Sequence, residues 1–268
     1  MPDIHECVSI SMIQTPPLPG SFQHSGQSFN QIIDHALEEA RILSKCGFDA
    51  VILQNMGDMP VRQQARPEVI AYFSVIAKEL KRNFSSLSLG ILINWDGVAS
   101  LAVAHATGAD FVRVEHVYTG VEVASAGLFT AQCCEITEMK KRLQTDLPVF
   151  ADVYEPHAVP LGPKPVEDAA WESVHEAFAG GLFLSGKNAK ESIDLIERAR
   201  TRVPDTTIFL GGGATGENVI ELLKHYDGVC VATWIKNGSL KNPIDSERAK
   251  RFIEKVNIAK AERKNQAS

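Results

Sequence analysis

Eight short apolar runs recur along this 268-residue chain, and this repetition restricts its fold more than any other feature. Each run is six or seven residues long, rich in β-branched residues and bounded by Gly, Asp, Pro or Asn. Such runs are typical of strands that are buried on both faces. We therefore predict strands over 7–13, 49–55, 88–94, 110–116, 148–153, 181–186, 207–212 and 228–233.

Amphipathic helical patterns separate these runs. In residues 28–45, for example, Phe29, Ile32 and neighbouring apolar residues fall near one face of a helix. Asn188 and Asp245 stand where helix N-caps are expected. Helices are predicted over 28–45, 67–82, 97–107, 127–143, 166–179, 188–202, 216–225 and 245–263.

The alternation of strands and helices predicts an α/β fold with a parallel sheet and helical crossovers. Eight units without a domain linker favour a single (β/α)8 TIM barrel over residues 1–268. A length of about 250 residues is typical of that fold. A doubly wound open sheet is the alternative.

Composition excludes several classes of function. The net charge is −6 and the sequence pI is about 5.8, and the chain lacks a basic cluster that could neutralise a run of nucleic-acid phosphates. No stretch approaches the ~18 uninterrupted apolar residues of a membrane span, and the first residues lack the pattern of a secretory signal. The five cysteines include no C-x-x-C pair and fit reduced thiols. We expect a cytoplasmic protein with no transmembrane segment and no nucleic-acid partner.

Two glycine-rich stretches have the spacing of nucleotide-binding loops. Residues 181–187 fit G-x-x-x-x-G-K, but Asn188 replaces the usual Ser or Thr, and residues 182–184 read as the interior of a strand. Residues 211–216 fit G-x-G-x-x-G. Only one more strand follows them, whereas the dinucleotide fingerprint opens a series of βα units. Neither stretch therefore predicts a nucleotide site.

The second stretch instead predicts a phosphate site. Loops after the seventh and eighth strands of TIM barrels commonly bind phosphate. Here Gly211, Gly212 and Gly213 follow the seventh predicted strand, and Ala232 and Thr233 end the eighth. Glycines allow the backbone to approach an anion closely. A tight turn without a ligand is the alternative interpretation.

Polar residues gather just past the predicted carboxyl ends of the strands, where the active sites of TIM barrels lie. Asp152 is a candidate base or metal ligand, or else a buried carboxylate paired within the protein. With Glu155 and His157 it is a candidate site for a divalent metal, although the spacing matches no established ligand motif. Glu115 alternates with Arg113, so both can point inward and pair. The other polar residues at these ends are Gln14, Gln54, Asn55, Asp58, Asn94, Asp96, His116 and Lys187.

Seven segments spread over nearly the whole chain resemble, in the same order, the BtpA/SgcQ family. The segments most specific to the family are "PPLPGS" (16–21) and "ADV…H…PL" (151–161). The full set is "SMIQTPPLPGS" (11–21), "VILQNMGDMP" (51–60), "GILINWDG" (90–97), "GADFVRVEHVYTG" (108–120), "FADVYEPHAVPL" (150–161), "LGGGATGENV" (210–219) and "DGVCVATWIKNGSLKNPIDSERAKRF" (227–252).

This resemblance implies a TIM barrel similar to aldolases or to ribulose-phosphate-binding proteins. The family takes its name from a factor needed for photosystem I accumulation, other members resemble enzymes of carbohydrate catabolism, and no reaction is firmly attached to it. The chain departs from the family pattern where Gln14 replaces a His and Gln54 replaces a Glu. The polar residues that it shares with the family are Asn55, Asp58, Asp96, Asp152 and His157.

Two hypotheses of function follow. In the first, the chain is a lyase, aldolase or isomerase of a small phosphorylated sugar or polyol. Asp152 then serves as base or metal ligand, while Asn55, Asn94 and Asp96 orient hydroxyl groups. In the second, the chain is a non-catalytic assembly or stability factor that keeps the barrel and binds a protein partner, since this fold hosts many functions. In either case we expect a homo-oligomer, because many barrels form one.

Overall fold

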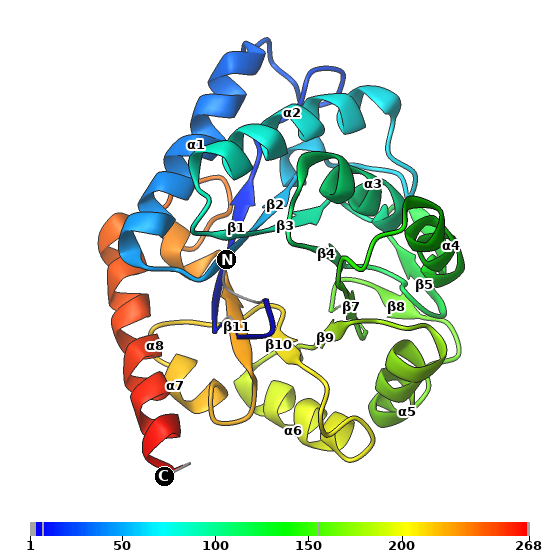
Figure 1. Ribbon diagram of the computed structural model, residues 1–268, viewed down its shortest axis with the longest axis vertical. Helices are drawn as coiled ribbons and strands as arrows, with labels where there is room; N and C mark the ends of the chain where they lie inside the picture. Colours follow the sequence, from blue (N-terminus) through cyan, green and yellow to red (C-terminus); the bar gives the residue numbers. More distant parts are fainter. Residues whose placement is uncertain (1–3, 7, 155, 267–268) are drawn as a thin grey trace.

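Eight parallel strands close into a barrel in the computed structural model, which describes residues 4–6, 8–154 and 156–266 (Figure 1). The order around the barrel is β1-β2-β3-β4-β7-β9-β10-β11, with β11 pairing back to β1. This closure confirms the predicted (β/α)8 barrel and excludes the open sheet. The strands are β1 (Ser9–Gln14), β2 (Ala50–Gln54), β3 (Ser88–Leu92), β4 (Phe111–Val114), β7 (Val149–Asp152), β9 (Gly181–Phe183), β10 (Ile208–Leu210) and β11 (Gly228–Val231).

Helices surround the barrel on the outside (Figure 1). They are α1 (Phe29–Cys46), α2 (Pro67–Asn83), α3 (Gly97–Thr107), α4 (Cys133–Leu143), α5 (Val166–Trp171), α6 (Ala189–Arg200), α7 (Val219–Leu222) and α8 (Ser246–Gln266). Both predicted N-caps are present. The Asn188 Oδ1 atom accepts a hydrogen bond from the Glu191 amide at 3.0 Å, and the Asp245 Oδ1 atom accepts one from the Arg248 amide at 3.0 Å.

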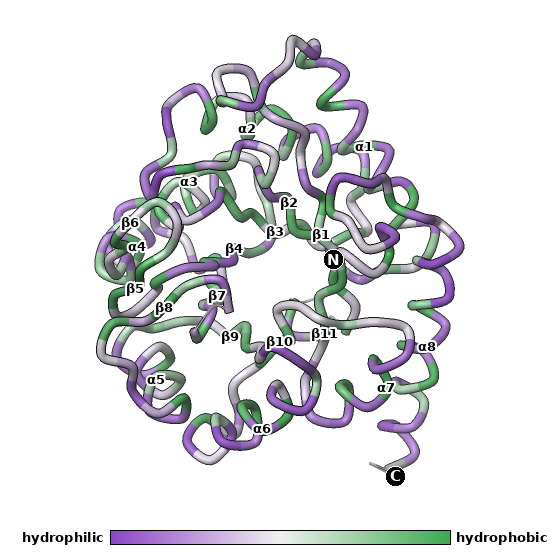
Figure 2. The backbone as a smooth tube through the Cα atoms, turned by 180° about the vertical axis from the view of Figure 1, so that it is seen from behind, coloured by the Kyte–Doolittle hydropathy of each residue, from purple (hydrophilic) through white to green (hydrophobic). Residues whose placement is uncertain are grey.

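Aromatic rings fill the interior of the barrel. The rings of Phe150, Phe183 and Phe209 pack with centroids 5.1 to 5.9 Å apart. Glycines make room for such rings, since a Cβ atom on Gly181 would lie 2.2 Å from the ring of Phe150. The interior is therefore a packed core rather than a pore, and Figure 2 shows the hydrophobic residues along the strands.

The N-terminal turn closes the amino end of the barrel. Ile4 packs against the interior cluster and is 4% exposed. His5 Nδ1 lies 2.8 Å from Thr207 Oγ1, just before β10.

A small antiparallel sheet was not predicted. It has the order β6-β5-β8 and consists of β5 (Val121–Ala124), β6 (Gly127–Thr130) and β8 (Val159–Pro160). The helix predicted over 127–143 is thus wrong in its first residues, because 127–130 form a hairpin with β5 through a tight turn at which Gly127 has φ +110°. The ring of Phe129, on β6, packs against Trp95 and His116, which anchors the sheet to the barrel.

Two other predicted helices are shorter than expected. The segment 166–179 is helical only to Glu176, and its last five helical residues form a π-helical turn. The segment 216–225 retains four residues in α7. Throughout the described residues, every helix is too short or too polar to cross a membrane.

Candidate active site

Inward-facing polar side chains line the carboxyl end of the barrel. Met12 and Ile52 belong to the interior cluster, and side chains two positions apart on a strand point to the same face. Gln14 and Gln54 therefore also point inward, one layer closer to the open end, and they are direct neighbours in the register of β1 and β2. Both are buried.

Hydrogen bonds join the Gln54 amide at the end of β2 to an amide after β3 and to a carboxylate after β4. Gln54 Nε2 donates to Asn94 Oδ1 at 2.8 Å and to Glu115 Oε2 at 3.2 Å. Gln14 is only 6% exposed, and its Oε1 atom accepts no hydrogen bond from any described residue. An unpaired buried acceptor is costly, so a hydroxyl or amide of a ligand would stabilise Gln14.

Asp152 forms a buried ion pair with Arg113. Arg113 Nε donates to Asp152 Oδ1 at 2.9 Å and Nη2 donates to Oδ2 at 2.7 Å, with the two side chains 5% and 6% exposed. The Arg113 guanidinium also stacks on the ring of Phe183 at 4.3 Å. The bidentate partner of Arg113 is Asp152, one strand away, and the charge of Glu115 also acts on the guanidinium.

The pKa of the Asp152 carboxyl is raised despite its ion pair with Arg113. Burial raises the pKa of Asp152 to about 6, although the positive charge of Arg113 and its hydrogen bonds act to lower this pKa. A carboxyl with a pKa close to the working pH can both accept and return a proton. Both oxygens of Asp152 are held in place by Arg113.

Asn55 and Asp58 bind backbone in the loops around the site. The Asn55 Oδ1 atom accepts a hydrogen bond from the Asn94 amide at 2.7 Å, and Asn55 Nδ2 donates to Asp58 Oδ2 at 3.0 Å. The other Asp58 oxygen accepts from the Leu18 amide at 2.7 Å. These contacts fix the loops after β1 and β2 to the end of β3.

Asp96, at the start of α3, also binds backbone amides, as Asn55 and Asp58 do. Its Oδ1 atom caps the helix by accepting from the Ala99 amide at 2.8 Å, and Oδ2 accepts from the Ala65 amide at 2.8 Å. Asp96 lies at the same end of the barrel as Asp152, but its oxygens bind neighbouring backbone.

The described residues do not assemble the candidate metal site. Asp152 faces Arg113, and His157 is exposed in the loop after β7. Glu155 lies outside the described residues. Elsewhere in the described ranges, no group of three or more His, Cys, Asp or Glu side chains is arranged to hold a metal ion.

The predicted phosphate loops form a pocket of about 300 Å³ between the ends of β10 and β11. Its lining includes all of Gly211, Gly212, Gly213, Ala232 and Thr233. At Gly212 the backbone φ is not positive, and a Cβ atom built there would meet nothing within 4 Å. The Gly212 and Gly213 amides donate no hydrogen bond to described residues, so they are available to an anion.

Arg248 is a residue of this pocket that the sequence analysis missed. It lies on the first turn of α8, and its guanidinium stacks 4.3 Å from the ring of Trp234. Its Nε atom donates to the Trp234 carbonyl at 2.6 Å, which fixes the positive group beside the glycine loop. The predicted N-cap at Asp245 could have indicated Arg248. It places Arg248, three residues later in the sequence, in the first turn of the helix that follows the eighth strand.

Solved structures share the barrel but are distant in sequence. Thiamine phosphate pyrophosphorylase from Pyrococcus furiosus superimposes with a TM-score of 0.57 at 14% identity, covering 95% of this chain and 97% of that one. A 3-hexulose-6-phosphate synthase gives a TM-score of 0.57 at 16% identity, covering 92% and 98%. At this level of identity the likeness establishes the fold alone.

Proteins that are similar in sequence align with this chain over most of their length. An uncharacterized protein of Thermococcus kodakarensis is 36% identical over 248 residues, which are 91% of this chain and 93% of the relative. The photosystem I biogenesis protein BtpA of Synechocystis is 31% identical, covering 91% and 86%. The sgc region protein SgcQ of Escherichia coli K12 is 31% identical, covering 92% and 93%. The model of the BtpA family matches residues 5–258, and the chain therefore belongs to the BtpA family.

Proposed function

We propose that this protein binds a small phosphorylated sugar or polyol and acts on it as a lyase, aldolase or isomerase. One observation carries the proposal: the pocket lined by Gly211, Gly212 and Gly213, here called the glycine-loop pocket, adjoins the buried carboxyl of Asp152. Arg113 Nη1 donates to the Gly211 carbonyl at 3.4 Å, while the same guanidinium holds Asp152. A phosphate bound at Gly212 would thus place the rest of a substrate over the polar mouth of the barrel.

The pocket has the donors that a phosphate needs. The amides of Gly212 and Gly213 are available, Thr233 adds a hydroxyl, and Arg248 adds a fixed positive charge. Binding energy from a phosphate that does not react can position the reacting carbons. The named substrates or products of thiamine phosphate pyrophosphorylase and 3-hexulose-6-phosphate synthase carry phosphate as well, which agrees with the proposal at the level of the fold.

In this proposal Asp152 moves the proton. Its pKa of about 6 suits a base that removes a proton next to a carbonyl and then returns it. Glu115 is the second carboxylate at the mouth, and Asn94 and Gln14 would bind substrate hydroxyls. Asn55 and Asp96 would act by holding the loops, while the exposed His157 would have to reach the substrate by movement of its loop.

A two-step experiment tests the proposal. A thermal-shift screen of sugar phosphates, with and without Mg²⁺, Mn²⁺ or Zn²⁺, identifies ligands, because a ligand that binds only the folded state raises the unfolding midpoint. Each ligand is then incubated with the protein in D₂O, and proton NMR follows exchange of the carbon-bound proton next to the carbonyl. We expect exchange that Asp152→Asn abolishes while the ligand still binds. Binding without exchange or product would contradict the enzyme hypothesis.

A partner-binding role is the second candidate function, and the outer face of the small sheet favours it. Val123, Leu128, Val159 and Leu161 share this face and are 40%, 59%, 66% and 55% exposed. A contiguous exposed apolar patch commonly marks a protein contact. Loss of a co-purifying partner in a Leu128→Lys variant, with no ligand found in the screen, would support this role.

A further inference from the structure

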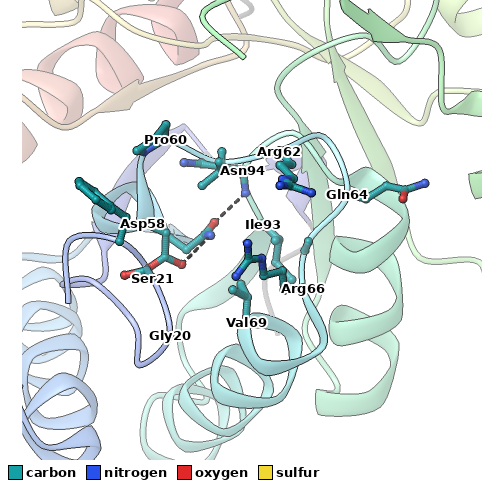
Figure 3. A pocket seen from close by; sticks show the side chains of 14 residues that line it. Gly20, Ser21, Asp58, Pro60, Arg62, Gln64, Arg66, Val69, Ile93 and Asn94 are labelled. Atoms are coloured by element: carbon teal, nitrogen blue, oxygen red, sulfur yellow. Dashed lines mark hydrogen bonds between the residues drawn. The ribbon is translucent and has the colours of Figure 1, made fainter. Parts of the chain in front are cut away.

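A second pocket lies beside the barrel mouth, between the loops after β1 and β2 and the first turn of α2. Its volume is about 320 Å³, at the lower end of the range for small-molecule sites. Figure 3 shows the labelled side chains that line it. None of its lining residues belongs to the glycine-loop pocket, but Asn94, a proposed ligand of substrate hydroxyls, lines it, so this pocket adjoins the proposed active site at Asn94.

Two arginines give the pocket a positive side. Arg62 and Arg66 both line it, and Figure 3 shows them across from Asp58 and Ser21. Arg62 forms no ion pair with a described carboxylate, and Arg66 has only a 3.9 Å contact to the exposed Glu68. Two guanidinium groups without close acidic partners are well suited to carboxylate or phosphate oxygens.

Asp58 contributes one negative charge against the two arginines, so the lining keeps a net positive charge. Asp58 is 4% exposed, and its two oxygens accept hydrogen bonds from the Leu18 amide and from Asn55 Nδ2. Asn55 in turn accepts a hydrogen bond from the Asn94 amide at 2.7 Å. Asp58 therefore stabilises the wall of the pocket, because its two oxygens bind the Leu18 amide and Asn55 Nδ2.

Apolar side chains form another part of the wall, and the arginine-bearing loop is held in position. Val61, Val69 and Ile93 line the pocket, and they offer a surface for the hydrocarbon part of a ligand. The arginine-bearing loop is fixed to α3, because the Ala65 amide donates to Asp96 Oδ2 at 2.8 Å. A site that is formed in advance loses less entropy on binding.

We infer that this pocket binds a small organic anion, whose carboxylate or phosphate group pairs with Arg62 and Arg66 and whose aliphatic part packs on Val61, Val69 and Ile93. Carboxylate and phosphate share the chemistry that two guanidinium groups recognise, and the apolar wall distinguishes both from an inorganic ion. The ligand would join the loops after β1 and β2 at the edge of the barrel mouth.

Titration calorimetry in the Gly212→Asp protein tests this inference, because the glycine-loop site is blocked in that background. The probes are inorganic phosphate, n-butyl phosphate and n-pentanoate. We expect n-butyl phosphate, n-pentanoate or both to bind at least about tenfold more tightly than inorganic phosphate, since burial of their methylene groups on the apolar wall is favourable. The probe that binds then identifies the charged group.

Two variants complete the test. Arg62→Gln with Arg66→Gln should weaken binding of that probe at least tenfold, whereas Arg82→Gln is the matched control. Arg82 is 77% exposed at the far end of α2 and should leave binding unchanged. Thermal melting checks that each variant folds. Unchanged affinity in the double variant, or no preference for either organic probe over inorganic phosphate, would overturn the inference and would leave the glycine-loop site untouched.

Discussion

Replacing Gly212 by Asp is the sharpest perturbation of the predicted phosphate site. The substitution adds a negative charge at the place where the anion should lie. It should not disturb folding, because Gly212 does not have a positive φ and an added Cβ atom would meet nothing within 4 Å. Loss of binding in this variant can therefore be assigned to charge rather than to strain.

The expected effect follows from Coulomb's law. Two unit charges 4 Å apart repel by about 1 kcal/mol in bulk water and by about 4 kcal/mol at the effective dielectric of a protein surface. A phosphate ester carries a charge of about −1.5 to −2 near neutral pH. The repulsion between the new carboxylate and the phosphate therefore costs about 1.5–8 kcal/mol of binding free energy. The lower limit corresponds to an affinity at least tenfold lower, and most of the range corresponds to no detectable binding.

The assay is titration calorimetry with the best sugar phosphate from the screen. Gly212→Asn is the matched control, because it adds nearly the same volume without the charge and should bind within a few-fold of the wild type. Thr233→Ala should weaken binding by about 0.5–1.5 kcal/mol through loss of one hydroxyl donor. Undiminished affinity in a folded Gly212→Asp protein would show that the phosphate binds elsewhere, and the reasoning from the glycine loop would then fail.

Three further predictions concern stability and assembly. Asp152→Asn leaves Arg113 buried without its counter-charge, so urea unfolding should show a loss of about 3–5 kcal/mol; a loss below 1 kcal/mol would contradict a tight pair. Burial acts to raise the pKa of Asp49, but hydrogen bonds from the start of β1 and the charge of Lys260 lower it below 3.8. A carboxyl group with a lowered pKa stabilises the folded protein above about pH 4, and this stabilisation is lost as the pH falls. The free energy of unfolding of Asp49→Asn should therefore depend less on pH below about pH 4 than that of the wild type. An unchanged pH dependence would argue against this role of Asp49. If a second copy covers the small sheet, light scattering should give a dimer or larger assembly that Leu128→Asp dissociates, whereas a wild-type monomer at micromolar concentration would refute the expected homo-oligomer.

The barrel itself could be predicted because its determinants are local. Each strand is a short apolar run that is buried on both faces, and each run is followed by an amphipathic helix. The small sheet was missed because its strands contain two to four residues, too few to show alternation. The turn before Gly127 carries no Asn-Gly or Asp-Gly signal. Its existence depends instead on the contact of Phe129 with Trp95 and His116, which no local pattern reveals.

The candidate site could be located from the sequence, but the pairing within it could not. Alternation placed Arg113 and Glu115 on one face, yet residues two apart on a strand are about 6.6 Å apart along it, whereas the neighbouring strand is only about 4.8 Å away. The bidentate pairing is therefore decided by β7, one of the two strands next to β4, and by the register that sets Arg113 opposite Phe150. That register brings Asp152 within reach of the guanidinium, and both then lie beside Gly211. Because one arginine contacts both the buried acid and the glycine loop, binding of an anion at Gly212 should alter the pKa of Asp152, which links the predicted phosphate site to the acid–base group through a single side chain.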